Sequence, residues 1–172
     1  MMLRFLQIFL FVLMSTVAFA NTDAPQEIKW DDLLPEGELE RLQEMYQKQI
    51  EMLYQADPIM EGSANDKAVQ FGTFNVVEEL DGENVRIPGY MVPLDLQDGK
   101  VTEFLLVPYF GACIHSPPPP PNQTVFVTSV EPVEFSWDAF WLEGTLKTET
   151  AESELANAAY TLELSKIEPY SS

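Results

Sequence analysis

The hydrophobic pattern of this 172-residue chain changes its period near residue 67, and this change constrains the fold more than any other feature. Between residues 36 and 56, apolar side chains recur every three or four positions, which is typical of an amphipathic helix. The apolar stripe consists of Leu39, Leu42, Tyr46, Ile50 and Leu53. From residue 67 onward, apolar and polar residues alternate as in half-buried strands. The pattern predicts a mainly β structure with an N-terminal helix packed on it through that stripe.

Six segments have the composition of strands. They are residues 70–77, 84–96, 101–107, 124–130, 140–149 and 158–167. Pro88 and Pro93 interrupt the second segment, which fits an edge strand or a bulge. Asp98 and Gly99 predict a hairpin turn before the third segment, which is expected to be buried on both faces from Phe104 onward.

Five or six strands with one helix predict a small β-barrel over about residues 68–170. An oligonucleotide/oligosaccharide-binding (OB) type barrel is one such solution. The periodicity alone leaves open another small α+β barrel or a sandwich. We expect residues 36–172 to form a single domain, preceded by a docking segment over residues 21–35.

Residues 1–20 have the features of an export signal. Arg4 provides the positive start, an apolar run follows, and Ala18 and Ala20 occupy the positions that a signal peptidase reads. The apolar run is short for a membrane-spanning helix. We therefore expect cleavage after Ala20 and a soluble periplasmic or secreted protein that begins at Asn21, with no membrane insertion after cleavage.

The chain is strongly acidic, with 28 acidic and 9 basic residues and a net charge of −19. Removal of a signal peptide containing Arg4 would make the charge one unit more negative. Such a charge repels nucleic acid and anionic membranes, and no basic groove for nucleic acid is visible in the sequence. It favours cations and basic partners, although an acidic surface without a specific partner is an open alternative.

Cys113 and His115 are the only cysteine and the only histidine, and they are two residues apart. On an extended segment both side chains point to the same side, where a thiolate and an imidazole suit zinc or copper. Further ligands would be Met91, Asp95, Glu103, water or groups of another molecule. The structural alternative is a buried thiol beside a hydrogen-bonding imidazole. A Cys–His nucleophile lacks a recognisable orienting group or oxyanion hole, so we expect no enzyme.

Five consecutive prolines follow, at residues 117–121. They favour a stiff extended rod, which could strap the rim of the barrel and fix the start of the strand at Thr124. The rod could instead dock on a partner's aromatic groove. The candidate partner-binding residues are Tyr109, Phe110, Pro117, Pro118, Pro119, Pro120 and Pro121.

Several motifs resemble an uncharacterised family of exported bacterial proteins, known as domain of unknown function 3299. They occupy residues 28–35, 85–94, 104–115, 117–122 and 141–146. The resemblance implies a small OB-like barrel and, for some members, work beside transporters that supply metals. Two functions follow as hypotheses: a non-enzymatic accessory protein that contacts zinc or copper beside a transporter system, or a ligand-free structural or protein-interaction barrel that uses its acidic surface and proline strap.

Overall fold

The computed structural model describes residues 24–55, 70–112 and 118–170, so the predicted signal peptide lies outside the described residues. The described elements are β1 (Gln26–Glu27), η1 (Trp30–Leu33), α1 (Glu38–Gln55), η2 (Glu78–Leu80), β2 (Asn84–Pro93), β3 (Lys100–Val107), η3 (Pro121–Gln123), β4 (Val125–Glu134), β5 (Ala139–Lys147) and β6 (Tyr160–Pro169). The prediction of a mainly β structure with one N-terminal helix is confirmed.

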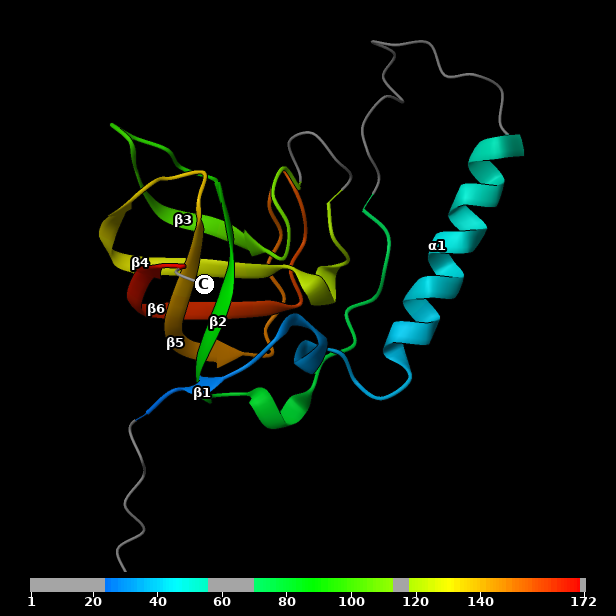
Figure 1. Ribbon diagram of the computed structural model, residues 1–172, viewed down its shortest axis with the longest axis horizontal. Helices are drawn as coiled ribbons and strands as arrows, with labels where there is room; N and C mark the ends of the chain where they lie inside the picture. Colours follow the sequence, from blue (N-terminus) through cyan, green and yellow to red (C-terminus); the bar gives the residue numbers. More distant parts are fainter. Residues whose placement is uncertain (1–23, 56–69, 113–117, 171–172) are drawn as a thin grey trace, which may run out of the picture.

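Five strands close into a small barrel (Figure 1). The order is β2-β3-β4-β6-β5, and β5 returns to pair with β2. All these pairs are antiparallel except β4 with β6, which is parallel because β6 inserts between β4 and β5. This crossing is compatible with a five-stranded Greek-key barrel of the OB type. The predicted small barrel is thus confirmed.

Strand β2 is continuous through both of its prolines. Its residues 84–90 pair with β5 and its residues 90–93 pair with β3. Pro88 therefore lies where only β5 is hydrogen-bonded alongside, and the missing N–H of its ring breaks no ladder to β3. The carbonyl of Pro88 accepts a hydrogen bond of 2.7 Å from the indole N–H of Trp30. This contact fastens the N-terminal segment to the barrel.

The predicted hairpin joins β2 to β3. Asp98 and Gly99 have φ values of 50° and 77°, as a tight two-residue turn requires. The flanking residues, Gln97 and Lys100, exchange two backbone hydrogen bonds of 2.8 and 2.9 Å. Glycine fits this turn because it reaches positive φ without steric cost.

The main core fills the inside of the barrel. The strands contribute alternate residues to it, such as Ile87, Phe104, Val127, Leu142 and Leu162. Ile28 and Leu33 of the N-terminal segment are buried in the same cluster, as expected for a docking segment.

A second cluster lies outside the barrel. Val92, Leu105 and Val107 point away from the main core and are covered by Ala112 and Ala156. Residues 104–107 are consequently all buried, which confirms the expectation that this strand is buried on both faces.

The prediction of a strand over residues 70–77 is wrong, because the segment pairs with none of the described strands. Its polar groups bond elsewhere: the Val77 N–H donates to the Tyr160 hydroxyl at 2.7 Å, and the Thr73 carbonyl accepts from the Asn122 N–H at 3.3 Å. Val76 and Val77 pack against the main core. The alternating pattern reflects an extended chain that lies across the barrel without joining its sheet.

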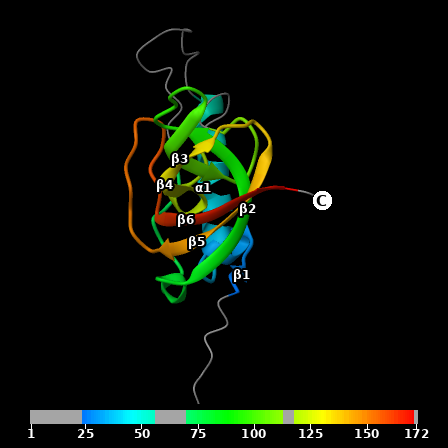
Figure 2. The same cartoon turned by 90° about the vertical axis from the view of Figure 1, so that its left-hand side faces the viewer.

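Helix α1 lies to one side of the barrel, with the 70–77 segment between them (Figures 1 and 2). Leu42 is 8% exposed, but Leu39 and Tyr46 are 46% and 50% exposed. The Tyr46 ring contacts Phe71, with centroids 5.3 Å apart, rather than a barrel strand. The predicted packing stripe thus differs from the structure at Leu39 and Tyr46, and the side chain of Leu53 lies outside the described residues. None of the described helices is long and apolar enough to cross a membrane.

Candidate functional site

The residues predicted to bind a metal, Cys113 and His115, lie outside the described residues, as does Pro117. The flanking residues Ala112 and Pro118 are both buried. Within the described part of the chain, no three His, Cys, Asp or Glu side chains are grouped as a metal site requires. The zinc or copper hypothesis therefore stays a prediction.

Two of the residues considered as further ligands have structural roles. Met91 is buried in the main core. The Asp95 carboxylate accepts hydrogen bonds from the Thr102 hydroxyl at 2.6 Å and from the backbone N–H groups of Thr102 and Glu103 at 3.1 and 3.0 Å. The Thr102 hydroxyl, together with these backbone donors, lowers the pKa of Asp95 despite a partial burial that opposes the shift. Asp95 thus holds the base of the β2–β3 hairpin.

The described prolines of the run are turned toward the protein. Pro118, Pro119 and Pro121 are buried and Pro120 is half-buried. A Cβ atom on Gly72 would lie 2.5 Å from the Cβ of Pro120, so only glycine lets the two segments meet here. This placement fits the predicted strap. Docking of a partner on the proline rings stays a prediction.

Hydrogen bonds to the proline carbonyls hold the strap in place. The Gln70 side-chain amide donates to the Pro119 carbonyl at 2.8 Å, and the Ala159 N–H donates to the Pro121 carbonyl at 2.8 Å. The Thr124 hydroxyl donates to the Pro120 carbonyl at 3.1 Å. The strap therefore sets where β4 begins.

A buried polar cluster joins α1, the 70–77 segment and the strap. Glu38, the first residue of α1, is 2% exposed. Its carboxylate accepts hydrogen bonds from the Thr73 hydroxyl and from the side-chain amides of Asn75 at 2.9 Å and Asn122 at 3.3 Å. Burial raises the pKa of Glu38, but these hydrogen bonds and the nearby Arg41 outweigh that effect and lower it.

No local sequence pattern indicates this cluster, because its residues are distant in the chain. Asn122 is fully buried, and its amide nitrogen lies 3.2 Å from both the Thr73 hydroxyl and the Asn75 carbonyl. The oxygen of the same amide has no hydrogen-bond partner among the described residues. The side chains of Thr73, Asn75 and Asn122 already donate hydrogen bonds to the Glu38 carboxylate. The cluster therefore has a structural role and fixes the start of α1.

Four aromatic rings contact one another in a chain at the surface, which we call the aromatic surface. Its members are Tyr90, Phe110, Phe135 and Trp137. Ring centroids are 5.9 Å apart for Tyr90 and Phe110, 6.2 Å for Phe110 and Trp137, and 4.8 Å for Phe135 and Trp137, each pair edge to face. Phe110 and Trp137 are 58% and 55% exposed. Of the four, only Phe110 was among the candidates predicted from sequence.

A cation–π contact lies on the outer face of the β2–β5 pair, between Arg86 of β2 and Trp141 of β5. The Arg86 guanidinium lies 4.0 Å from the centroid of the Trp141 ring. Three carboxylates surround the same guanidinium, at 3.0 Å from Glu27, 3.4 Å from Glu143 and 3.8 Å from Glu168. This arrangement combines a cation–π contact with a network of ion pairs.

The two aromatic groups share one face of the sheet. Tyr90 pairs with Ala139, and Pro88 pairs with Trp141, so Tyr90 and Trp141 are diagonal neighbours in the register. Diagonal neighbours on one face are within reach of aromatic side chains. The aromatic surface and the Arg86 network are therefore adjacent.

The ligand face that other OB barrels use is partly covered here. Such barrels bind oligonucleotides or oligosaccharides across their second and third strands, which correspond to β3 and β4. The outward side chains Leu105, Val107 and Phe126 belong to the second cluster, beneath Ala112 and Ala156. The chain's own loops thus occupy part of this face.

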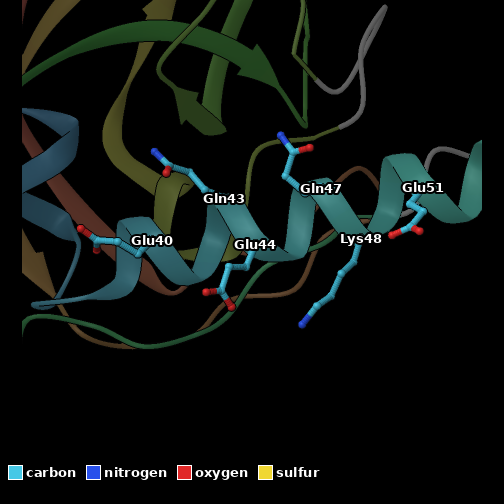
Figure 3. A pocket seen from close by; sticks show the side chains of 6 residues that line it. All are labelled: Glu40, Gln43, Glu44, Gln47, Lys48 and Glu51. Carbon is cyan, nitrogen blue, oxygen red and sulfur yellow. The ribbon is translucent and has the colours of Figure 1, made fainter.

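Two surface hollows involve α1, and neither brings reactive side chains from several elements together. One follows α1 and is lined by Glu40, Gln43, Glu44, Gln47, Lys48 and Glu51, all from the same helix (Figure 3). A groove of about 240 Å³ lies between α1 and the strap, lined by Leu42, Gln43, Tyr46, Gln47, Phe71 and Pro120. The first has no wall from another described element, and the second is mainly apolar with two side-chain amides.

A closed five-stranded barrel with an N-terminal helix, a proline strap and a partly covered ligand face defines a small OB-like barrel protein. The chain belongs to the family described as "protein of unknown function (DUF3299)", whose model matches residues 30–169. It is similar to a DUF3299 family protein from Pseudomonas aeruginosa PAO1 of known crystal structure, with 41% sequence identity and a TM-score of 0.65. That match covers 87% of this chain and 98% of the other. No curated protein matches the sequence significantly.

Proposed function

We propose that this chain is an exported, non-enzymatic accessory protein that binds a partner protein through its aromatic surface. The observation that carries the proposal is the chain of four contacting rings, of which Phe110 and Trp137 are more than half exposed. Aromatic residues are enriched in protein interfaces, where they supply contact area at a small cost in conformational entropy.

The position of the rings supports this function. Tyr90 belongs to β2, which is paired on both sides at this residue. The edge-to-face contacts link the exposed rings to this rigid strand. Rings fixed in this way lose little freedom on binding, so more of the contact energy appears as affinity.

A non-enzymatic role is part of the proposal. Glu38 and Tyr160 are buried ionisable residues with shifted pKa values, the kind of group that often marks catalysis. Here each is bonded to segments that hold the fold together, Glu38 to the 70–77 segment and Tyr160 to Leu33 and Val77. Their shifted pKa values have a structural explanation. The acidic charge of −19 disfavours nucleic acid as the partner.

Site-specific photo-crosslinking in expressing cells tests this function. A photoreactive amino acid at Phe110 or Trp137 should give one discrete adduct with a partner protein. The matched control places the same group at Met52, an exposed apolar residue on α1. Identical adduct patterns at Met52 and Trp137, or no adduct at Phe110 and Trp137, would contradict the proposal.

A second candidate function is contact with zinc or copper(I) beside a transporter system. It is supported by the pairing of the only thiol and the only imidazole, two residues apart. Calorimetric titration of the reduced protein should show binding that weakens in Cys113→Ser and His115→Ala and at lower pH, because protons compete for both ligands. Equal binding by all three proteins would assign the ion to surface carboxylates instead.

Export is the remaining element of the proposal. It rests on the signal-like residues 1–20 and on the cleavage pattern at Ala18 and Ala20. Mass spectrometry of periplasmic or secreted material should find Asn21 at the amino terminus. A protein that keeps Met1 to Ala20 would contradict this location.

A further inference from the structure

We propose that the aromatic surface recognises a positively charged, extended segment of its partner that carries arginine or lysine side chains. The inference rests on the proposed function and adds the chemical class of the partner. Three properties of this face support it: the charges beside the rings, an arginine already bound next to them, and the spacing of the rings.

The charges beside the exposed rings favour a cation. Asp138 follows Trp137 in the chain, Glu134 precedes Phe135, and both acidic residues are exposed. Glu134 is the register partner of Lys100 across the β3–β4 pair, so its charge is partly balanced there and the local attraction depends mainly on Asp138. The whole chain has a net charge of −19, which adds a long-range attraction for basic segments and speeds their encounter with the surface.

The protein already binds a guanidinium on the adjacent part of this face. Arg86 lies 4.0 Å from the Trp141 ring centroid, and Glu143 and Glu168 lie 3.4 and 3.8 Å from its nitrogens. In this molecule, an indole ring and neighbouring carboxylates thus already hold one arginine side chain in place. Trp137 and Asp138 are exposed neighbours in the chain, and neither has an arginine among its described contacts.

The spacing of the rings favours an extended partner. Consecutive centroids are separated by 5.9, 6.2 and 4.8 Å from Tyr90 through Phe110 and Trp137 to Phe135. In an extended chain, side chains on the same side recur about every 6.6 Å. Alternate residues of an extended segment can therefore meet the two exposed rings, Phe110 and Trp137, whose centroids are 6.2 Å apart.

Other partners fit this surface less well. A second copy of the chain carries the same charge of −19 and would be repelled. An anionic partner would be repelled by the same negative charge. A neutral sugar can stack on the rings, but its binding would depend little on salt or on the charge of Asp138.

Fluorescence anisotropy with a defined probe tests the inference. The probe is the labelled peptide Gly-Arg-Gly-Arg-Gly-Arg-Gly, and its matched counterpart has neutral citrulline in place of arginine. The arginine peptide should bind about tenfold more tightly, and its affinity should fall as salt rises. Trp137→Ala and Phe110→Ala should each weaken binding about tenfold, and Asp138→Asn about threefold. Circular dichroism confirms that each variant is folded.

Variants on α1 separate the proposed site from general attraction to an acidic protein. Tyr46→Ala removes an aromatic ring of similar exposure, and Glu44→Gln removes an exposed carboxylate elsewhere on the same helix. Both should leave peptide binding unchanged. Equal weakening in these variants, or equal binding of the citrulline peptide, would overturn the inference. Binding of a neutral oligosaccharide that Trp137→Ala abolishes would overturn it too.

Failure of the inference is distinguishable from failure of the proposed function. A partner crosslinked at Trp137 without any affinity for the arginine peptide would leave the function standing and overturn the basic-segment assignment. Loss of both the crosslink and the peptide affinity would overturn both. A crosslinked peptide containing arginine or lysine, identified by mass spectrometry, would support both.

Discussion

The hydroxyl of Tyr160 donates a hydrogen bond of 2.8 Å to the carbonyl of Leu33, which lies 127 residues earlier in the chain. Both residues are fully buried. The same hydroxyl accepts the Val77 N–H at 2.7 Å. One side chain on β6 thus joins the N-terminal segment and the 70–77 segment to the barrel.

Replacing Tyr160 with Phe should destabilise the protein by about 1–3 kcal/mol. The change removes one oxygen and leaves the buried carbonyl of Leu33 and the N–H of Val77 without their partner. Urea unfolding followed by circular dichroism measures the difference. Tyr170→Phe, at an exposed tyrosine, is the matched control and should be neutral. Equal stability of the Tyr160→Phe variant and the wild type would contradict the proposed joining role.

Stability should fall at alkaline pH because of the same residue. Burial raises the pKa of Tyr160 from 10.0 to about 12. The unfolded chain therefore loses this proton first, and the stabilisation present below pH 10 is lost as pH rises toward 12. The full loss is on the order of 3 kcal/mol. Unfolding curves between pH 9 and 12 should show a steeper decline in wild type than in Tyr160→Phe, and parallel declines would count against this assignment.

Replacing Glu38 with Gln should cost about 1–3 kcal/mol at neutral pH. The new amide brings N–H donors toward Asn75 and Asn122, whose amides already donate to this site. Because the pKa of Glu38 is lowered in the folded state, its stabilisation is present above about pH 4.5 and is lost as pH falls. The gap between wild type and variant should narrow at pH 3. Glu40→Gln, at an exposed position two residues along α1, should show neither effect.

Replacing Gly144 with Ala should destabilise the barrel by about 1–3 kcal/mol or more. A Cβ atom at this position would lie 2.3 Å from the Glu163 carbonyl oxygen and 2.8 Å from a methyl carbon of Leu162. The backbone of β6 would have to move, which makes overpacking costly here. Thr145→Ala on the outer side of β5 provides the comparison in thermal unfolding. A Gly144→Ala variant as stable as wild type would show that β5 and β6 separate easily.

Local patterns were sufficient to predict most elements. The 3.6-residue period identified α1, and the Asp98–Gly99 pair identified the β2–β3 turn, because each depends on residues that are neighbours in the chain. The same reasoning failed for residues 70–77. An extended chain that packs one side on a core shows the alternation of a strand whether or not its backbone joins a sheet.

Packing between segments that are distant in the chain could not be predicted from the sequence. The apolar stripe of α1 indicates that the helix has a buried face, yet Leu39 and Tyr46 remain about half exposed. The pattern indicates which side of the helix is apolar, but it does not indicate how far other segments bury that side. Glu38 similarly appeared as an acid at a helix start, while its burial depends on Asn122, 84 residues away.

The amino-acid sequence by itself determined the mainly β class, the one helix, the small barrel and the family resemblance. Hydrophobic period, turn residues and motifs are local signals, because each depends on a short stretch of chain. Only the tertiary structure assembled the aromatic surface. Its rings come from β2, from the residues after β3 and from the connection between β4 and β5, and barrel closure brings them together. Contacts of this kind depend on strand order and register, and no local pattern records which distant side chains will meet.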